Sequence, residues 1–308
     1  MHCVLEGVAK QLADIWFSAV HSPAYVGVPS KRQSVISRLD SLKPPQFFTR
    51  LPRTLDDRST WKTSEWKWWL LFYAVPCLDG ILPTEYHDHF CLLVNGIFLL
   101  LKDRITRNDL KVAMDNLARF VYQVEQLYGQ ESMTFNIHQL VHLPQSVQQL
   151  GPLWSHSTFV FESGNGLLLN LVSDANGVPL QVLERFTMSL QLRRLLQTMS
   201  LSTEVQALCE QMTSSNATES PPEKPLGKGC FTSVGSHEAT LFVSKLGQHP
   251  KNVVEYERIL VRGQSYHVQS YQRTKRTCNC YFKSMDGLYH VLDRVLMLED
   301  GKCYLVAR

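Results

Sequence analysis

The sequence predicts an α+β fold in which a mainly helical block is followed by a small antiparallel β-barrel. Apolar side chains recur at helical spacing through residues 60–150. Residues 213–229 are polar and proline-rich, with Leu226 as their one large apolar residue, and are predicted to form a linker. Beyond the linker, alternating apolar residues indicate about six short strands. Such strands form a small antiparallel barrel or sandwich, and we predict a barrel. The predicted domains are residues 1–212 and 230–308.

The helical block divides at prolines, glycines and capping residues. A first helix is expected over residues 3–20, followed by an irregular proline-rich connector to residue 60. Pro76 should kink or end the helix that contains it. The further expected helices run from Lys31 to Leu42, from Ser64, from Glu85 to Asp103, from Thr106 or Asn108 to Gly129, from Met133 to Leu150, from Pro179 to Met199 and from Ser202 to Met212.

Short strands are expected in the last part of the chain. Turns are indicated by Gly263, by Asp286-Gly287 and by Asp300-Gly301, and the last two are typical of hairpins. The expected strands are Ala239–Val243, Glu255–Val261, Ser265–Tyr271, Cys278–Phe282, Leu288–Met297 and Cys303–Ala307.

Composition and charge favour an intracellular globular protein. Residues 221–308 hold 13 Lys and Arg against 8 Asp and Glu, a basic excess that is compatible with nucleic-acid contact but not diagnostic of it. The eight cysteines lack the paired spacing of a zinc site, and Cys278-Asn-Cys280 is too tight for one, so we expect reduced thiols. The first residues do not resemble a secretory signal, and no apolar run reaches the roughly 18 residues of a membrane span. We therefore expect no membrane partner.

The stretch from Trp154 to Gly166 is the first candidate for chemistry. Glu162 follows the apolar run Phe159–Phe161 and precedes two glycines and a leucine-rich segment. The pattern predicts that the chain leaves an extended or buried segment and begins a helix with a carboxylate in its first turn. Two interpretations of Glu162 stay open: a carboxylate favoured by the helix dipole, and a functional acid.

Further landmarks occur along the chain in a defined order. They are His2–Lys10, Ser64-Glu-Trp66 with Ile81-Leu-Pro83 and Tyr86, Met133–His138 with His142-Leu143, Gly151–Trp154, Phe161–Ser163 with Asn165-Gly166, Asn176–Phe186, and Glu255–Leu260 with Gly263 and Tyr266. In order and spacing they resemble the transposases of CACTA/EnSpm-type DNA transposons, in the animal branch of that family. The resemblance covers nearly the whole chain, and no single motif in it is decisive.

The resemblance implies an RNase H-like nuclease core that uses three acidic residues. Two Mg²⁺ ions about 4 Å apart can clamp the attacking and leaving oxygens of a phosphodiester, and such hard cations take carboxylate ligands. In this family a helical insertion separates the second acid from the third, which makes Glu162 the candidate third acid. His2 looks like the last residue of the Asp-x-x-His motif that carries the second acid. The chain then resembles the C-terminal portion of a transposase that lacks the first two of the three catalytic acids.

This interpretation predicts that the chain alone is catalytically inactive. No cofactor is expected for it, although an intact homologue would use Mg²⁺, and Glu162 would bind metal only if missing residues completed the site. The expected remaining role is DNA or protein binding, in the nucleus rather than the cytoplasm. The alternative is a domesticated protein-interaction module with no nucleic-acid role. Truncation also predicts exposed apolar surface around Phe159–Phe161 and along the helix from Leu167.

Two further groups of residues are candidates for binding. Arg273, Lys275 and Arg276 lie in a predicted hairpin or loop and could contact DNA phosphates. The alternative is that their charges protect an edge strand. His138 and His142 are four residues apart and face the same way on a helix. Helix packing or hydrogen bonding, metal ligation and a family-specific role are the three interpretations of this pair.

Overall fold

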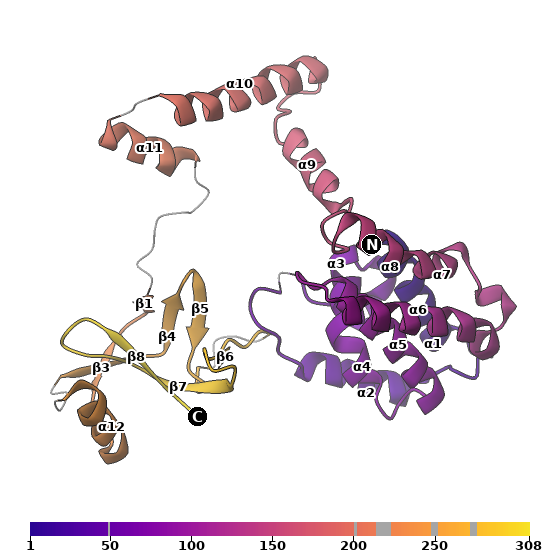
Figure 1. The fold of residues 1–308 in the computed structure, drawn as a ribbon, viewed down its shortest axis with the longest axis horizontal. Helices are drawn as coiled ribbons and strands as arrows, with labels where there is room; N and C mark the ends of the chain where they lie inside the picture. Colours follow the sequence, from indigo (N-terminus) through magenta and orange to yellow (C-terminus); the bar gives the residue numbers. More distant parts are fainter. Residues whose placement is uncertain (49, 200–201, 214–222, 248–251, 272–275) are drawn as a thin grey trace. The chain divides into compact units, whose positions relative to one another are not determined.

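The computed structural model describes residues 1–48, 50–199, 202–213, 223–247, 252–271 and 276–308. It confirms an α+β protein, with helices along most of the chain and antiparallel sheets in its last part (Figure 1). The chain forms two compact units, Met1–Leu42 with Phe48–Val178, and Lys43–Phe47 with Pro179–Arg308. The short segment Lys43–Phe47 therefore belongs to the unit that carries the sheets, although the residues on both sides of it belong to the helical unit.

The helices predicted between residues 3 and 213 are present, with ends that differ from the predictions by a few residues, together with short helices that were not predicted, such as the 3-10 helix Leu55–Thr60 in the connector expected to be irregular. They are η1 Cys3–Ala9, α1 Lys10–Ser18, α2 Pro29–Ser41, η2 Leu55–Thr60, α3 Thr63–Trp68, η3 Trp69–Tyr73, α4 Ala74–Leu78, α5 Thr84–Leu100, α6 Arg107–Tyr128, η4 Gln130–Ser132, α7 Phe135–Gln139, η5 Leu140–His142, α8 Leu143–Leu150, α9 Phe159–Leu169, α10 Val178–Thr198 and α11 Thr203–Thr213.

The tryptophan-rich helix passes through Pro76 and continues to Leu78. Its middle part, η3, is π-helical and directly precedes the turn that contains Pro76. Proline has no amide hydrogen, and its ring clashes with the carbonyl four residues earlier, here that of Phe72. The π-helical stretch before Pro76 spaces these groups differently, and the helix ends two residues beyond the proline, so the predicted end of the helix lies close to Pro76.

Large aromatic side chains form the core of the helical unit. The ring of Trp16 meets that of Phe90 edge-on, with centroids 5.0 Å apart. Trp66 and Trp69 are fully buried, whereas Trp68 is only partly buried. The buried positions of this helix recur three and four residues apart, and Phe72 is 43% exposed, so the core covers one face of the helix rather than most of its sides, as the tryptophans alone would suggest.

Helices α5 and α6 lie side by side (Figure 1) and approach closely at Gly96. A Cβ atom on Gly96 would lie 2.8 Å from Cγ of Leu117. The predicted cap of α6 is confirmed: Thr106 Oγ1 accepts a hydrogen bond from the Asp109 amide at 3.0 Å, and the Asp109 carboxylate accepts one from the Thr106 amide at 2.9 Å. The predicted stop is confirmed by Gly129, which has φ 89°.

Helix α9 corrects the prediction for the run Phe159–Phe161. These residues are helical rather than extended, and the helix begins before Glu162 instead of at it. A run of three apolar residues fits a strand or a helix equally well by its pattern alone. The leucines that follow extend one continuous helix through the glycines to Leu169.

The strands form two antiparallel sheets. One has three strands in the order β1-β4-β5, and the other has the order β2-β3-β7-β6 with β8 paired to β7. In the part of the chain that the structure describes, no closed barrel is found. The strands are β1 Glu223–Leu226, β2 Cys230–Thr232, β3 Val253–Tyr256, β4 Arg258–Val261, β5 Gln264–His267, β6 Tyr281–Lys283, β7 Tyr289–Met297 and β8 Cys303–Ala307.

A break at Glu257 explains why the predicted barrel is replaced by two sheets. The single strand predicted over residues 255–261 is divided there into β3 and β4, which belong to different sheets. The first strand of the smaller sheet, β1, pairs with β4 and comes from the end of the predicted linker; residues 214–222 of that linker lie outside the described residues. The β4–β5 hairpin turns at Arg262 and Gly263, with φ 48° and 79°. Positive φ at both positions is typical of a tight two-residue hairpin turn.

The strand predicted over residues 239–243 is part of a helix, α12, which spans Ser236–Leu246. Its ends explain the difference. The Glu238 carboxylate accepts a hydrogen bond from the Gly235 amide at 3.0 Å, and Gly247 ends the helix with φ 75°. Phe242 is buried, with its ring 5.4 Å from that of Tyr304.

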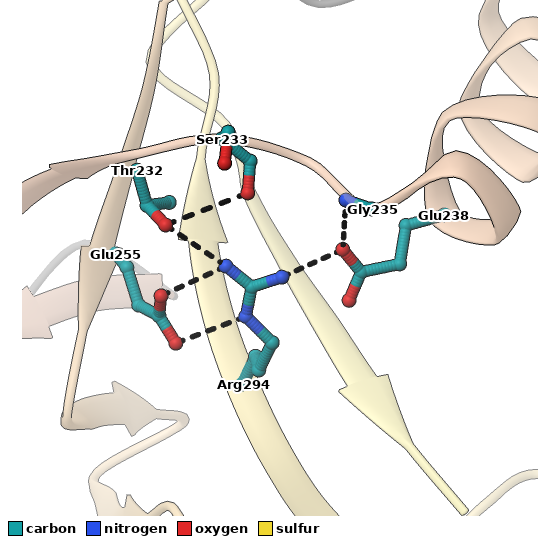
Figure 2. Close-up of polar contacts among 6 residues, drawn as sticks. All are labelled: Thr232, Ser233, Gly235, Glu238, Glu255 and Arg294. Atoms are coloured by element: carbon teal, nitrogen blue, oxygen red, sulfur yellow. Dashed lines mark hydrogen bonds and ion pairs between the residues drawn. The ribbon is translucent and has the colours of Figure 1, made fainter.

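Arg294 on β7 connects the five-stranded sheet to α12 (Figure 2). Its guanidinium donates two hydrogen bonds to Glu255 of β3, at 3.0 and 2.8 Å, and one to Glu238 of α12 at 2.6 Å. A further hydrogen bond reaches Thr232 Oγ1 at 3.2 Å. The hydrogen bonds from Arg294 lower the pKa of Glu255. Four elements of the unit, β2, β3, β7 and α12, are thus joined at one side chain.

Candidate functional site

Glu162, the candidate third acid, lies near the start of α9. Its side chain and those of Phe159–Phe161 lie outside the described part of the structure. Further along the same helix, Leu167 and Leu169 are 68% and 72% exposed. The exposed apolar surface predicted along the helix from Leu167 is therefore present at these two residues.

His2, the second predicted site residue, lies at the N-terminal end of η1. Its Nδ1 atom lies 3.6 Å from a carboxylate oxygen of Glu6, and both side chains are exposed. The other Glu6 oxygen accepts a hydrogen bond from the hydroxyl of Thr63. His2 thus lies beside an acidic side chain one helical turn further along the chain.

A shallow hollow of about 680 Å³ lies next to Glu6, over η1 and α1. Its polar lining residues are Glu6, Lys10, Gln11, Asp14, Ser18, Thr134 and Asn136. Asp14 forms an ion pair with Arg58 at 3.3 Å. In the described residues, which exclude the Glu162 side chain, no three His, Cys, Asp or Glu side chains are grouped so that they could hold a metal ion.

The predicted DNA-contact residues are described only in part. Arg273 and Lys275 lie outside the described residues, and Arg276 is exposed. At Tyr271, the last described residue before them, the centre of the ring lies 5.4 Å from the guanidinium carbon of Arg258. DNA contact by Arg273, Lys275 and Arg276 stays a prediction.

His138 and His142 contact each other. Their Nε2 atoms are 3.2 Å apart, and both side chains are exposed at the α7–η5 junction. At this distance one neutral ring can donate to the other, as in the hydrogen-bonding interpretation. A third histidine, His89, is buried, with Nε2 2.8 Å from the Phe120 carbonyl oxygen. Burial lowers the pKa of His89, which favours its neutral form.

The structure also contains a groove that the sequence did not predict, on the unit that carries the sheets. It has a volume of about 560 Å³ and lies between Pro45–Phe47, the β4–β5 hairpin and β6. The sequence signal was present in Pro44-Pro45 and in the tyrosines of residues 281–289. The two signals lie more than two hundred residues apart, so neither pointed to the other.

Comparison with known proteins yields no relative: no family model, curated protein or solved structure matches the chain. In the described part of the chain, no helix is both long enough and apolar enough to cross a membrane.

Proposed function

We propose that the chain is a transposon-derived binding protein that resembles the C-terminal part of a DDE-type DNA transposase and does not cut DNA by itself. The ordered motifs support this origin, and the origin carries with it an ancestral RNase H-like core and a nuclear location. Among residues 1–308 the resemblance assigns one acid, Glu162. A two-metal site needs several carboxylates, so one acid is too few for the ancestral chemistry.

The observation that supports a binding role most strongly is the exposure of apolar side chains on α9 and α10. Large exposed apolar surfaces on soluble proteins mark interaction sites or aggregation-prone regions. The exposed residues are Leu167, Leu169, Leu180, Leu183, Phe186, Met188, Leu190, Leu192 and Leu195. Leu167 and Leu169 belong to one unit and the other residues belong to the second unit, so these are two separate surfaces, and we infer that a macromolecular partner covers part of the larger one, on α10.

A cleavage assay tests the catalytic part of the proposal. The purified chain and its Glu162→Gln variant are incubated with labelled duplex DNA in Mg²⁺ and in Mn²⁺. Neither protein should cleave the DNA. Cleavage by the unchanged chain that is lost in the variant would contradict the proposal, because other acids of this chain would then complete a metal site.

Salt-dependent DNA binding tests the DNA-binding part. Each phosphate that a protein neutralises contributes about 0.9 to the slope of log affinity against log salt for duplex DNA. Replacing Arg273, Lys275 and Arg276 with alanine together should lower that slope by about 2–3. Fluorescence anisotropy with labelled duplex DNA over a salt series measures it.

A matched control removes three exposed basic residues from the helical unit. Arg107 and Lys111 lie in the first turns of α6, Arg104 lies just before this helix, and all three are exposed. Their joint replacement with alanine removes the same net charge and should leave the slope within about 1 of the original value. Equal losses from the two triple variants would indicate a nonspecific charge effect.

The alternative function is a protein-interaction module with no nucleic-acid role. The apolar character of the exposed α9 and α10 residues favours it, since phosphate contacts are made by basic and polar groups. Salt-insensitive capture of a protein partner without DNA, which is lost when Leu183 and Leu190 are changed to glutamate, would select this alternative.

A further inference from the structure

The chain's own segment Lys43–Phe47 lies against the groove of about 560 Å³ on the second unit. The amide of Cys278 donates a hydrogen bond to the carbonyl oxygen of Pro44 at 2.9 Å. The amide of Gln46 donates one to Oδ1 of Asn279 at 2.7 Å. These contacts use main-chain groups of the segment, in which Gln46 and Phe47 form a turn, so they do not depend on particular side chains.

Asn279 is fixed in place by the neighbouring strand β5. Its side-chain amide donates a hydrogen bond to the Ser265 carbonyl oxygen at 2.6 Å, and its main-chain amide donates one to His267 Nε2 at 2.8 Å. Its carbonyl oxygen accepts a third hydrogen bond from the His267 amide at 3.2 Å. The remaining acceptor, Oδ1, is therefore held in position to receive a peptide amide, and little conformational entropy is lost when one binds.

Aromatic rings line the rest of the groove. The rings of Tyr266 and Phe282 meet nearly at right angles with centroids 6.5 Å apart. The Tyr281 and Tyr289 side chains also line the groove and are 58% and 77% exposed, although the chain's own segment is already in place. The Lys283 ammonium lies 5.4 Å from the centre of the Tyr289 ring. The groove thus keeps aromatic surface available next to the seated segment.

Proline-rich peptides suit a surface of this kind. Their fixed φ holds them in an extended polyproline conformation before binding, and aromatic-lined grooves recognise them for that reason. The seated segment contains Pro44-Pro45 followed by Gln46 and Phe47. We propose that this groove is a peptide-binding site for a proline-containing segment of a partner protein, and that Lys43–Phe47 is its built-in competitor. This binding role does not depend on the transposon origin.

The competition makes the proposal testable in the full chain. A tethered segment has an effective concentration in the millimolar range, so an added peptide binds weakly while the segment stays seated. Gln46→Pro removes the amide hydrogen that Asn279 accepts, and Pro44→Gly with Pro45→Gly removes the stiffness of the segment. A labelled peptide with the sequence of residues 42–48, Leu-Lys-Pro-Pro-Gln-Phe-Phe, should bind either variant about ten-fold or more tightly than the unchanged chain.

Groove variants decide whether the peptide binds at the proposed place. In the Gln46→Pro chain, adding Asn279→Ala or Tyr281→Ala should weaken the peptide about ten-fold, whereas Phe231→Ala should not. Phe231 lies on β2, is 85% exposed and does not line the groove, so it controls for loss of a surface aromatic. A peptide with alanine in place of both prolines should bind about ten-fold more weakly than the original.

Three outcomes would overturn the proposal. The first is no peptide binding by either opened variant up to about 1 mM. The second is binding that the Asn279 and Tyr281 changes leave intact in correctly folded protein, as judged by circular dichroism. The third is displacement of the peptide by single-stranded DNA, which would assign the aromatic rings to base stacking instead.

Discussion

Glu65 is a buried charged side chain in the first turn of α3, next to the partly exposed Arg53. It is only 1% exposed, and Arg53 binds it through Nε at 2.8 Å and through a second guanidinium nitrogen at 3.1 Å. The amides of Lys62 and Arg53 also donate to it, at 2.9 and 3.3 Å. Burial raises the pKa of Glu65, but these hydrogen bonds outweigh burial, so its pKa lies below the usual value.

Glu65→Gln should destabilise the chain in a pH-dependent way. A lowered pKa in the folded state means that ionised Glu65 contributes its full stability above the pKa of the unfolded chain, about 4.3. That contribution is lost as pH falls through the lower pKa of the folded state. At neutral pH the variant should therefore lose about 1–3 kcal/mol, and the difference should shrink below about pH 4. Urea unfolding at several pH values measures it.

The control is Glu125→Gln, because Glu125 is exposed on α6. Its stability should follow that of the unchanged chain at every pH. A constant loss for Glu65→Gln from about pH 7 to pH 3 would contradict the prediction, since an uncharged packing effect has no such pH dependence.

At the scale of single residues, the sequence predicts those features whose interaction partners lie close by in the chain. The Thr106 cap and the Gly129 stop follow from local rules, because their partners lie within a few residues. The same holds for the contact between His138 and His142. Asn279 could not be recognised in this way. Its partner Gln46 is 233 residues away, and no local pattern connects the two.

At the scale of elements, the same division separates helices from strands. Helix hydrogen bonds and caps are local, so most helices could be predicted from spacing and capping residues. Strand pairing joins segments that are distant in the sequence. Glu223–Leu226 was predicted to be part of a linker, but it forms a strand because it pairs with β4. Residues 239–243 show the reverse case, in which a strand was predicted from an apolar run but a helix is present. The hydrogen bond between the Glu238 carboxylate and the Gly235 amide caps this helix.

The packing of α5 against α6 depends on the absence of a side chain at Gly96. A Cβ there would lie 2.8 Å from Cγ and 2.9 Å from Cδ2 of Leu117, closer than van der Waals contact. Gly96→Ala should force Leu117 to move and should cost about 1–3 kcal/mol, despite the better helix propensity of alanine. Thermal unfolding followed by circular dichroism measures the cost.

Gly164→Ala on α9 is the matched control for Gly96→Ala. Nothing lies within 4 Å of a Cβ built on Gly164, so only the helix propensity changes there. This variant should be neutral or should gain up to about 1 kcal/mol of helix stability. If both variants were neutral, α5 and α6 would be able to separate without cost, and the close crossing would not determine stability.

At the scale of the whole molecule, sequence order and spatial grouping differ. The chain leaves the helical unit at Leu42, contributes Lys43–Phe47 to the other unit and returns at Phe48. Composition marked this region only as a proline-rich connector, because its partners appear more than two hundred residues later. The proposed ancestral nuclease site likewise needs acids in addition to Glu162, the one acid that the resemblance assigns among residues 1–308.

The exposed leucines of α9 and α10 lead to a prediction about the behaviour of the whole chain. Removing one large apolar side chain from water contributes about 1.5–3 kcal/mol, so several such residues can drive association. Leu183 and Leu190 are 64% and 50% exposed on α10. The unchanged chain should therefore show concentration-dependent association in sedimentation velocity, and changing both residues to glutamate should weaken it about ten-fold or more. Tyr122→Glu, at a position of α6 that is 73% exposed, should not weaken it. A chain that stays monomeric up to about 100 μM would contradict the prediction, because these apolar side chains would then be tolerated in water without any partner.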